Sequence, residues 1–146
     1  MSARAPRIVV AGASGFVGRA LLPGLVARGE VLALTRVPPA GAGRGVSWRR
    51  CDLFSVRETE IALEGADYAY YLVHSMMPSA RLTQARFADI DLLLADNFAR
   101  AAARARVRQI VYLGGLVPDG ENTSLHLRSR REVEEALASR GVPLTA

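Results

Sequence analysis

The sequence predicts an α/β protein with a doubly wound parallel sheet. Short apolar segments typical of strands alternate with segments of helical spacing along almost all of the 146 residues. A glycine-rich turn follows the first strand segment. Half of the residues are hydrophobic and 23% are charged, which supplies the core of one ordinary domain. Strands joined by helices imply right-handed crossovers, with helices on both faces of the sheet.

Five segments predict strands, of which residues 46–50 form the weakest and the others are short and mostly apolar. They are residues 7–11, 30–35, 46–50, 67–73 and 109–113. A sixth strand begins at Val142 and is cut short after residue 145. We therefore expect residues 1–146 to form a nucleotide-binding domain truncated after about five strands. The closing strand and a substrate-binding region would follow Ala146.

Four segments have apolar residues at helical spacing. They are residues 15–27, 55–63, 82–105 and 125–140. Ser55 followed by Glu58 forms a capping box, which marks the start of the second helix. Pro23 is awkward inside the first helix because it removes a backbone donor.

The glycine turn connects the first strand to the first helix. The first glycine of such a turn allows a positive φ, the second lets the backbone approach a pyrophosphate, and the third lets the helix pack closely on the strand. The helix N-terminus adds free N–H groups and a partial positive charge. This is the dinucleotide-binding arrangement of a Rossmann-type fold. The predicted cofactor-binding residues of the turn are Gly12, Ala13, Ser14, Gly15, Phe16, Val17 and Gly18.

The end of the second strand indicates which cofactor binds. An acidic residue there would hydrogen-bond a free ribose 2′-hydroxyl, but this chain has Thr35 followed by Arg36. The guanidinium of Arg36 can hold a 2′-phosphate in a forked contact, so the sequence favours NADP over NAD. The alternative is an ordinary surface arginine.

Asp52 and Leu53 follow the third strand, at the edge of the sheet where adenine usually lies. Asp52 can accept a hydrogen bond from the adenine amino group. It can equally cap the helix that begins at Ser55. The sequence leaves these two roles open.

Composition excludes several other classes. No apolar run is long enough for a membrane span and no signal peptide is evident, so we expect a soluble cytoplasmic protein. Cys51 is the single cysteine and is more typical of a small buried residue than of a nucleophile. No residues have metal-ligand spacing, so we expect no metal. The net charge of +5 comes from scattered arginines, without a motif for nucleic acid.

Two short motifs complete a family resemblance, LVHSM at residues 72–76 and HLRSR at residues 126–130. With the glycine turn, the chain resembles extended and atypical members of the short-chain dehydrogenase/reductase superfamily over essentially its whole length. The motifs are most similar to YbjT-like proteins. These are NmrA-like relatives of the complex I NADPH-binding subunit and are commonly named nucleoside-diphosphate-sugar epimerases.

The resemblance implies a catalytic Tyr and Lys four residues apart, assisted by a Ser at the end of the fifth strand. The matching positions hold His126, Arg130 and the pair Gly114 and Gly115, and the chain contains no lysine. His126 can act as an acid or base, and Arg130 can hold the ribose or stabilise negative charge. Alternatively, both residues only line or cap the helix, where Glu134 offers Arg130 an ion pair.

The fourth strand is followed by Val73, His74 and Ser75, at the carboxyl edge of the sheet where ligands bind. We expect these residues to contact the cofactor through their backbone, and we assign no chemistry to the His74 ring.

Two functions remain open. The chain belongs either to an NAD(P)-dependent oxidoreductase or epimerase-like enzyme, or to a non-catalytic NADP-binding redox sensor that reports to a protein partner. The missing Tyr, Lys and Ser favour the sensor, while the glycine turn fits both. Long helices beside the sheet are compatible with a homodimer.

Overall fold

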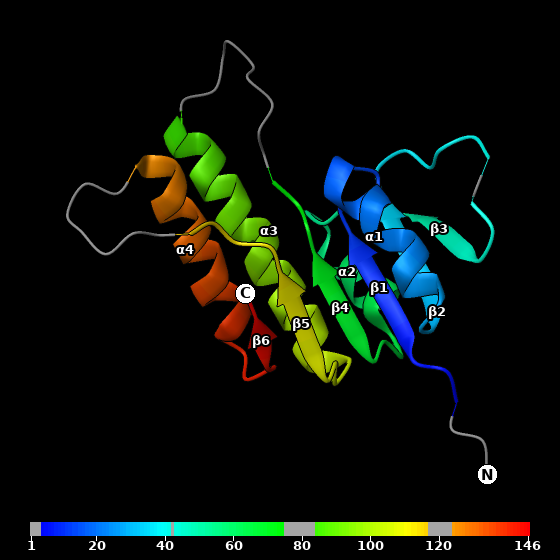
Figure 1. Ribbon diagram of the computed structural model, residues 1–146. Helices are drawn as coiled ribbons and strands as arrows, with labels where there is room; N and C mark the ends of the chain where they lie inside the picture. Colours follow the sequence, from blue (N-terminus) through cyan, green and yellow to red (C-terminus); the bar gives the residue numbers. More distant parts are fainter. Residues whose placement is uncertain (1–3, 42, 75–83, 117–123) are drawn as a thin grey trace.

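The computed structural model describes residues 4–41, 43–74, 84–116 and 124–146. Six parallel strands form one sheet in the order β3-β2-β1-β4-β5-β6 (Figure 1). The strands are β1 (Arg7–Ala11), β2 (Glu30–Thr35), β3 (Val46–Arg50), β4 (Tyr68–Tyr71), β5 (Gln109–Tyr112) and β6 (Leu144–Thr145). The helices are α1 (Phe16–Val26), α2 (Val56–Leu63), α3 (Gln84–Arg104) and α4 (Leu125–Ala138). The predicted α/β class and Rossmann-type topology are confirmed.

The sheet separates two apolar cores, because alternate strand residues point to opposite faces. On one face α1 places Leu22 and Leu25 against Ile8, Val10 and neighbouring strand residues. The other face is covered by α2, α3 and α4 and contains a larger cluster that includes Tyr71, Phe98, Tyr112 and Leu137. The helices α3 and α4 pack side by side (Figure 1). Helices therefore cover both faces, as the crossover rule requires.

The strand order reverses at β1. The chain moves outward from β1 to β2 and β3, and then returns to β4 on the other side of β1. In open parallel sheets, ligands bind in the crevice outside the carboxyl ends of the strands at this switch point. A ligand is therefore expected beside the segments that follow β1, β2 and β4.

Element ends differ slightly from the sequence prediction. The strand predicted over residues 67–73 ends at Tyr71, because its partner β1 ends at Ala11 and Gly12 turns away. The helix α1 continues through Pro23. Ser55 is the N-cap of α2, where its Oγ accepts from the Glu58 N–H at 3.2 Å. None of the helices in the described ranges is long and apolar enough to cross a membrane.

Candidate functional site

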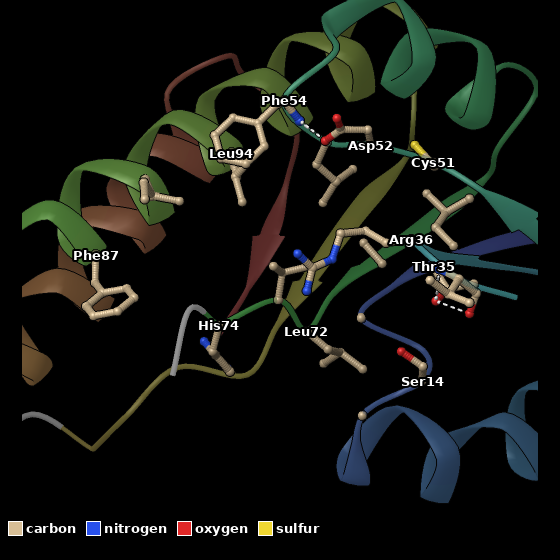
Figure 2. Close-up of a pocket in the computed structure, with 18 residues that line it drawn as sticks. Ser14, Thr35, Arg36, Cys51, Asp52, Phe54, Leu72, His74, Phe87 and Leu94 are labelled. Atoms are coloured by element: carbon tan, nitrogen blue, oxygen red, sulfur yellow. Dashed lines mark hydrogen bonds between the residues drawn. The ribbon is translucent and has the colours of Figure 1, made fainter. Parts of the chain in front are cut away.

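A cavity of about 610 Å³ opens at the carboxyl ends of β1, β2 and β4. Its walls come from the glycine turn, from the segments after β2, β3 and β4, and from α3. Figure 2 shows Ser14 on one side of the cavity, His74 and Phe87 on the other, and the Arg36 side chain extending between them. The cavity therefore lies at the switch point of the sheet.

The three glycines of the turn have three different geometries. Gly12 has a φ of +80°, and a Cβ there would lie 2.6 Å from the Leu72 carbonyl oxygen. A Cβ on Gly18 would lie 2.5 Å from the Gly12 carbonyl oxygen. A Cβ on Gly15 would meet protein only at 3.4 Å, so this glycine keeps space on the cavity side. These geometries match the tight turn, the close helix packing and the ligand approach expected of such a turn.

The start of α1 is open to a ligand. Gly15 is the N-cap and supplies no side-chain cap, and the first turn of α1 contains no acidic residue. The first N–H groups of a helix have no partner within the helix and favour an anion. Of the seven predicted turn residues, Gly12, Ser14 and Gly15 line the cavity. The others are Ala13 and Gly18, which are buried, Phe16, which is 92% exposed, and Val17, which is half-buried.

Arg36 directly follows β2 and lines the cavity. The preceding Thr35 fixes the turn, because its Oγ1 accepts from the Val37 N–H at 3.3 Å and donates to the Val37 carbonyl at 3.1 Å. In the β2–β3 register, Thr35 pairs with Arg50, so a second exposed arginine lies beside this turn. This corner of the cavity is therefore suited to negative charge.

Asp52 and Leu53 also line the cavity. The Asp52 Oδ1 accepts from the Phe54 N–H at 3.0 Å, and the Asp52 N–H donates to the Glu58 carboxylate at 2.8 Å. Asp52 thus organises the turn before α2, while Ser55 is the N-cap. Its adenine contact stays a prediction.

The helix α3 supplies a wall that the sequence did not predict. Phe87, Ile90 and Leu94 face the cavity at helical spacing. One turn further along, the buried Asn97 amide donates to the carbonyl oxygens of Leu53 at 3.0 Å and Phe54 at 3.3 Å. The helical pattern could have revealed the apolar wall. The contact of Asn97 with a loop more than forty residues earlier left no local signal.

His74 and Val73 line the cavity just after the end of β4, and their contact with a cofactor stays a prediction. Ser75 lies outside the described residues. The His74 ring is tilted against the Tyr112 ring, with 6.2 Å between the ring centres. Burial lowers the pKa of His74, and the positive charge of Arg130 lowers it further. The lowered pKa favours the neutral imidazole at pH 7.

His126 and Arg130 lie together on the first turns of α4. Arg130 donates through Nε to His126 Nε2 at 3.1 Å and through Nη1 to the Gly114 carbonyl at 3.1 Å. Neither residue lines the cavity, but both act electrostatically on His74. Among the ion pairs of the described residues, none joins Arg130 to Glu134. Arg130 therefore connects α4 to the end of β5.

The NAD-dependent epimerase/dehydratase family matches residues 8–134. The chain belongs to this family. The predicted resemblance to the extended short-chain dehydrogenases/reductases is thereby confirmed. The family is named for its dependence on NAD, so a nicotinamide dinucleotide is the cofactor type that the comparisons support for this chain.

Two curated proteins are similar in sequence. The auxiliary protein GraX of Staphylococcus aureus is 30% identical over 118 residues, which are 80% of this chain and 38% of that protein. A ketoreductase of Stigmatella aurantiaca is 34% identical over 109 residues, 73% of this chain and 33% of that protein. Its name gives its substrate as 4-hydroxy-2-methyl-3-oxo-4-farnesyl-3,4-dihydroquinoline-1-oxide. The chain thus spans about a third of these relatives' length.

Several solved structures are similar to this chain in fold. The NADPH-dependent quinone oxidoreductase QOR2 of Escherichia coli, complexed with NADPH, has a TM-score of 0.75 and 24% identity over 94% of this chain and 46% of that chain. Uronate dehydrogenase of Agrobacterium tumefaciens has a TM-score of 0.73 and 20% identity, covering 89% of this chain and 53% of that chain.

Proposed function

We propose that this chain is the NADP(H)-binding domain of an atypical oxidoreductase of the family. The observation that carries the proposal is the cavity in which the glycine turn and Arg36 face the same space. The pyrophosphate binds to the amides at the start of α1, next to Gly15. The adenosine half extends toward Arg36, Asp52 and Leu53. A substrate region then completes the site from residues beyond Ala146.

NADP is the preferred cofactor because the corner after β2 is positively charged. Arg36 holds the 2′-phosphate in a charge-assisted contact, and the neighbouring Arg50 adds to the local potential. The NADPH-bound quinone oxidoreductase among the similar structures agrees with this preference, while other similar structures were solved with NAD.

Cofactor preference tests this part of the proposal. Replacing Arg36 by Asp puts a carboxylate where the 2′-phosphate binds, so NADP affinity falls while NAD affinity is kept or rises. Calorimetric titration with both cofactors measures the ratio. Arg131→Asp, an exposed change of equal charge on α4, is the matched control and leaves the ratio unchanged. NADP affinity that stays the same in Arg36→Asp refutes the 2′-phosphate site.

The reaction is hydride transfer between the nicotinamide and a carbonyl or quinone substrate. The names of the ketoreductase and the quinone oxidoreductase support this class. In the absence of the usual Tyr and Lys, Arg130 stabilises negative charge on the substrate oxygen and His126 offers its Nδ1 as a hydrogen-bonding group. The Nε2 of His126 is already occupied by Arg130.

A second candidate is a non-catalytic NADP-binding regulator. The occupied His126 Nε2 and the similarity to an auxiliary protein favour it. Hydride transfer by the full-length protein distinguishes the two candidates. NADPH oxidation with aldehydes, ketones or quinones, lowered in His126→Ala, supports the enzyme. Cofactor binding without turnover over the whole panel supports the regulator. A cytoplasmic location and a homodimer remain predictions for either.

A further inference from the structure

Arg19 carries the only charge on α1 and lies close to the amino-terminal end of that helix. This end is the positive end of the helix dipole, so a cation there is electrostatically unfavourable. Among the ion pairs of the described residues, none gives Arg19 an acidic partner. A residue that opposes a local rule without compensation within the fold is a candidate for function.

The Arg19 side chain folds back toward the glycine turn. Its Nε donates to the Ser14 carbonyl oxygen at 2.9 Å. Side chains of a helix lean toward its N-terminus, which allows this contact five residues back along the chain. The Ser14 carbonyl belongs to the same peptide unit as the Gly15 nitrogen, so standard bond lengths place the Arg19 Nε within about 5.5 Å of that nitrogen. The positive charge therefore lies beside the N-cap of α1.

The segment that Arg19 contacts is part of the candidate site. Ser14 and Gly15 line the cavity, and Figure 2 shows the Ser14 side chain at its wall. The Gly15 N–H donates to the Gly12 carbonyl at 3.2 Å, and the Arg19 N–H donates to the Gly15 carbonyl at 3.0 Å. Arg19 is thus hydrogen-bonded, through its backbone and its side chain, to the turn on which the pyrophosphate is proposed to bind.

We propose that Arg19 is a cofactor-binding residue whose guanidinium attracts the pyrophosphate at the start of α1. The inference rests on the proposed dinucleotide site and adds to it a charge that serves NADP and NAD equally, because both contain the pyrophosphate. The phosphates neutralise a cation that the helix dipole disfavours in the empty protein. For opposite charges about 6 Å apart at the protein surface, the attraction changes affinity by about three- to tenfold.

Arg28 offers a matched control just beyond the other end of α1. Its Nη1 donates to the Gly24 carbonyl oxygen at 3.0 Å, and like Arg19 it is exposed. It also has no ion pair among the described residues. A cation near a helix C-terminus is favourable. The two arginines therefore share one kind of hydrogen bond and differ in their distance from the glycine turn.

Calorimetric titration with NADP+ and with NAD+ tests the inference on the wild type, Arg19→Gln, Arg19→Lys and Arg28→Gln. We expect Arg19→Gln to weaken both cofactors by the same factor, about three- to tenfold at low salt, and the factor to shrink as NaCl is raised. Arg19→Lys keeps the charge and binds within about twofold of the wild type, and Arg28→Gln binds like the wild type. Unchanged affinity in Arg19→Gln, or a loss for NADP+ alone, overturns the inference.

Thermal unfolding of the empty proteins separates binding from a structural role. Arg19→Gln removes a cation that opposes the helix dipole, so its melting temperature is expected to equal or exceed that of the wild type. A melting temperature that falls further in Arg19→Gln than in Arg28→Gln overturns the inference. If neither dinucleotide binds the folded wild type, the proposed cofactor site fails. If the wild type binds and Arg19→Gln binds equally well, only the role of Arg19 fails.

Discussion

At the level of single residues, the three glycines of the turn differ in whether the fold would tolerate a side chain in their place. Gly18 and Gly12 are needed by the fold, because a Cβ on either would overlap backbone atoms. Gly15 could accept a Cβ, because that atom would lie 3.4 Å from the Gly12 carbonyl oxygen, an ordinary contact distance. The structure thus distinguishes two glycines that the fold requires from one that it does not require.

Alanine substitutions make this separation measurable. Gly18→Ala forces the Cβ to within 2.5 Å of a carbonyl oxygen and lowers the free energy of unfolding by about 3 kcal/mol. Gly15→Ala changes it by less than about 1 kcal/mol, because the φ of −73° suits alanine. It nevertheless weakens NADP+ binding by about tenfold, or about 1.4 kcal/mol, because the methyl group occupies ligand space.

Urea unfolding and calorimetry provide both readouts. Gly24→Ala, in the same helix with only the end of the Arg28 side chain nearby at 3.7 Å, is the control and is expected to stabilise by up to about 1 kcal/mol. A Gly15→Ala protein that binds NADP+ as tightly as the wild type would remove this glycine from the site.

At the level of elements, α3 supports the site through one buried amide. Asn97 donates to the carbonyl oxygens of Leu53 and Phe54, and so fixes the loop between β3 and α2 that lines the cavity. The apolar residues Phe87, Ile90 and Leu94 extend the same helix face toward the cavity. The helix therefore acts as a wall that positions the β3–α2 loop.

Asn97→Leu tests this support. The substitution leaves two carbonyl groups without their donor and lowers the free energy of unfolding by about 1–3 kcal/mol. Arg100→Ala on the same helix removes an exposed pair with Asp96 and costs about 0.5 kcal/mol. Chemical denaturation measures both. If Asn97→Leu costs no more than Arg100→Ala, the amide does not hold the loop.

The sequence predicted the elements well where local pattern decides them. Residues 7–11 and 30–35 were placed correctly because buried parallel strands are continuous apolar runs bounded by glycine or charge. The predicted end of β4 is two residues late, because the β1–β4 pairing ends where the turn at Gly12 follows β1. Asn97 was missed for the same reason, since its partners lie far away in the sequence.

At the level of the whole molecule, the buried protonated groups connect stability to pH. Burial raises the pKa of the Cys51 thiol to about 11 and that of Tyr112 to about 12, and it also raises the pKa of Tyr71. Their unfolded values lie near 9 and 10. Each group therefore stabilises the fold fully below pH 9, and this contribution is lost as pH rises through the folded value.

Stability should consequently fall between pH 9 and pH 10.5. Thermal unfolding of the wild type and Cys51→Ala is compared at pH 7, 9 and 10.5. The variant starts from a lower melting temperature, because a buried side chain is shortened, and then loses less than the wild type over this interval. An equal or larger loss in Cys51→Ala contradicts the assignment of a protonated, buried thiol.

We propose that the switch point of the sheet is a dinucleotide site built on the glycine turn and completed by Arg36. Isothermal titration of the correctly folded chain with NADP+ and with NAD+ tests it most directly. We expect saturable one-to-one binding to both dinucleotides, with the higher affinity for NADP+. The absence of heat with either dinucleotide, oxidised or reduced, at several temperatures would contradict it and leave only the architecture.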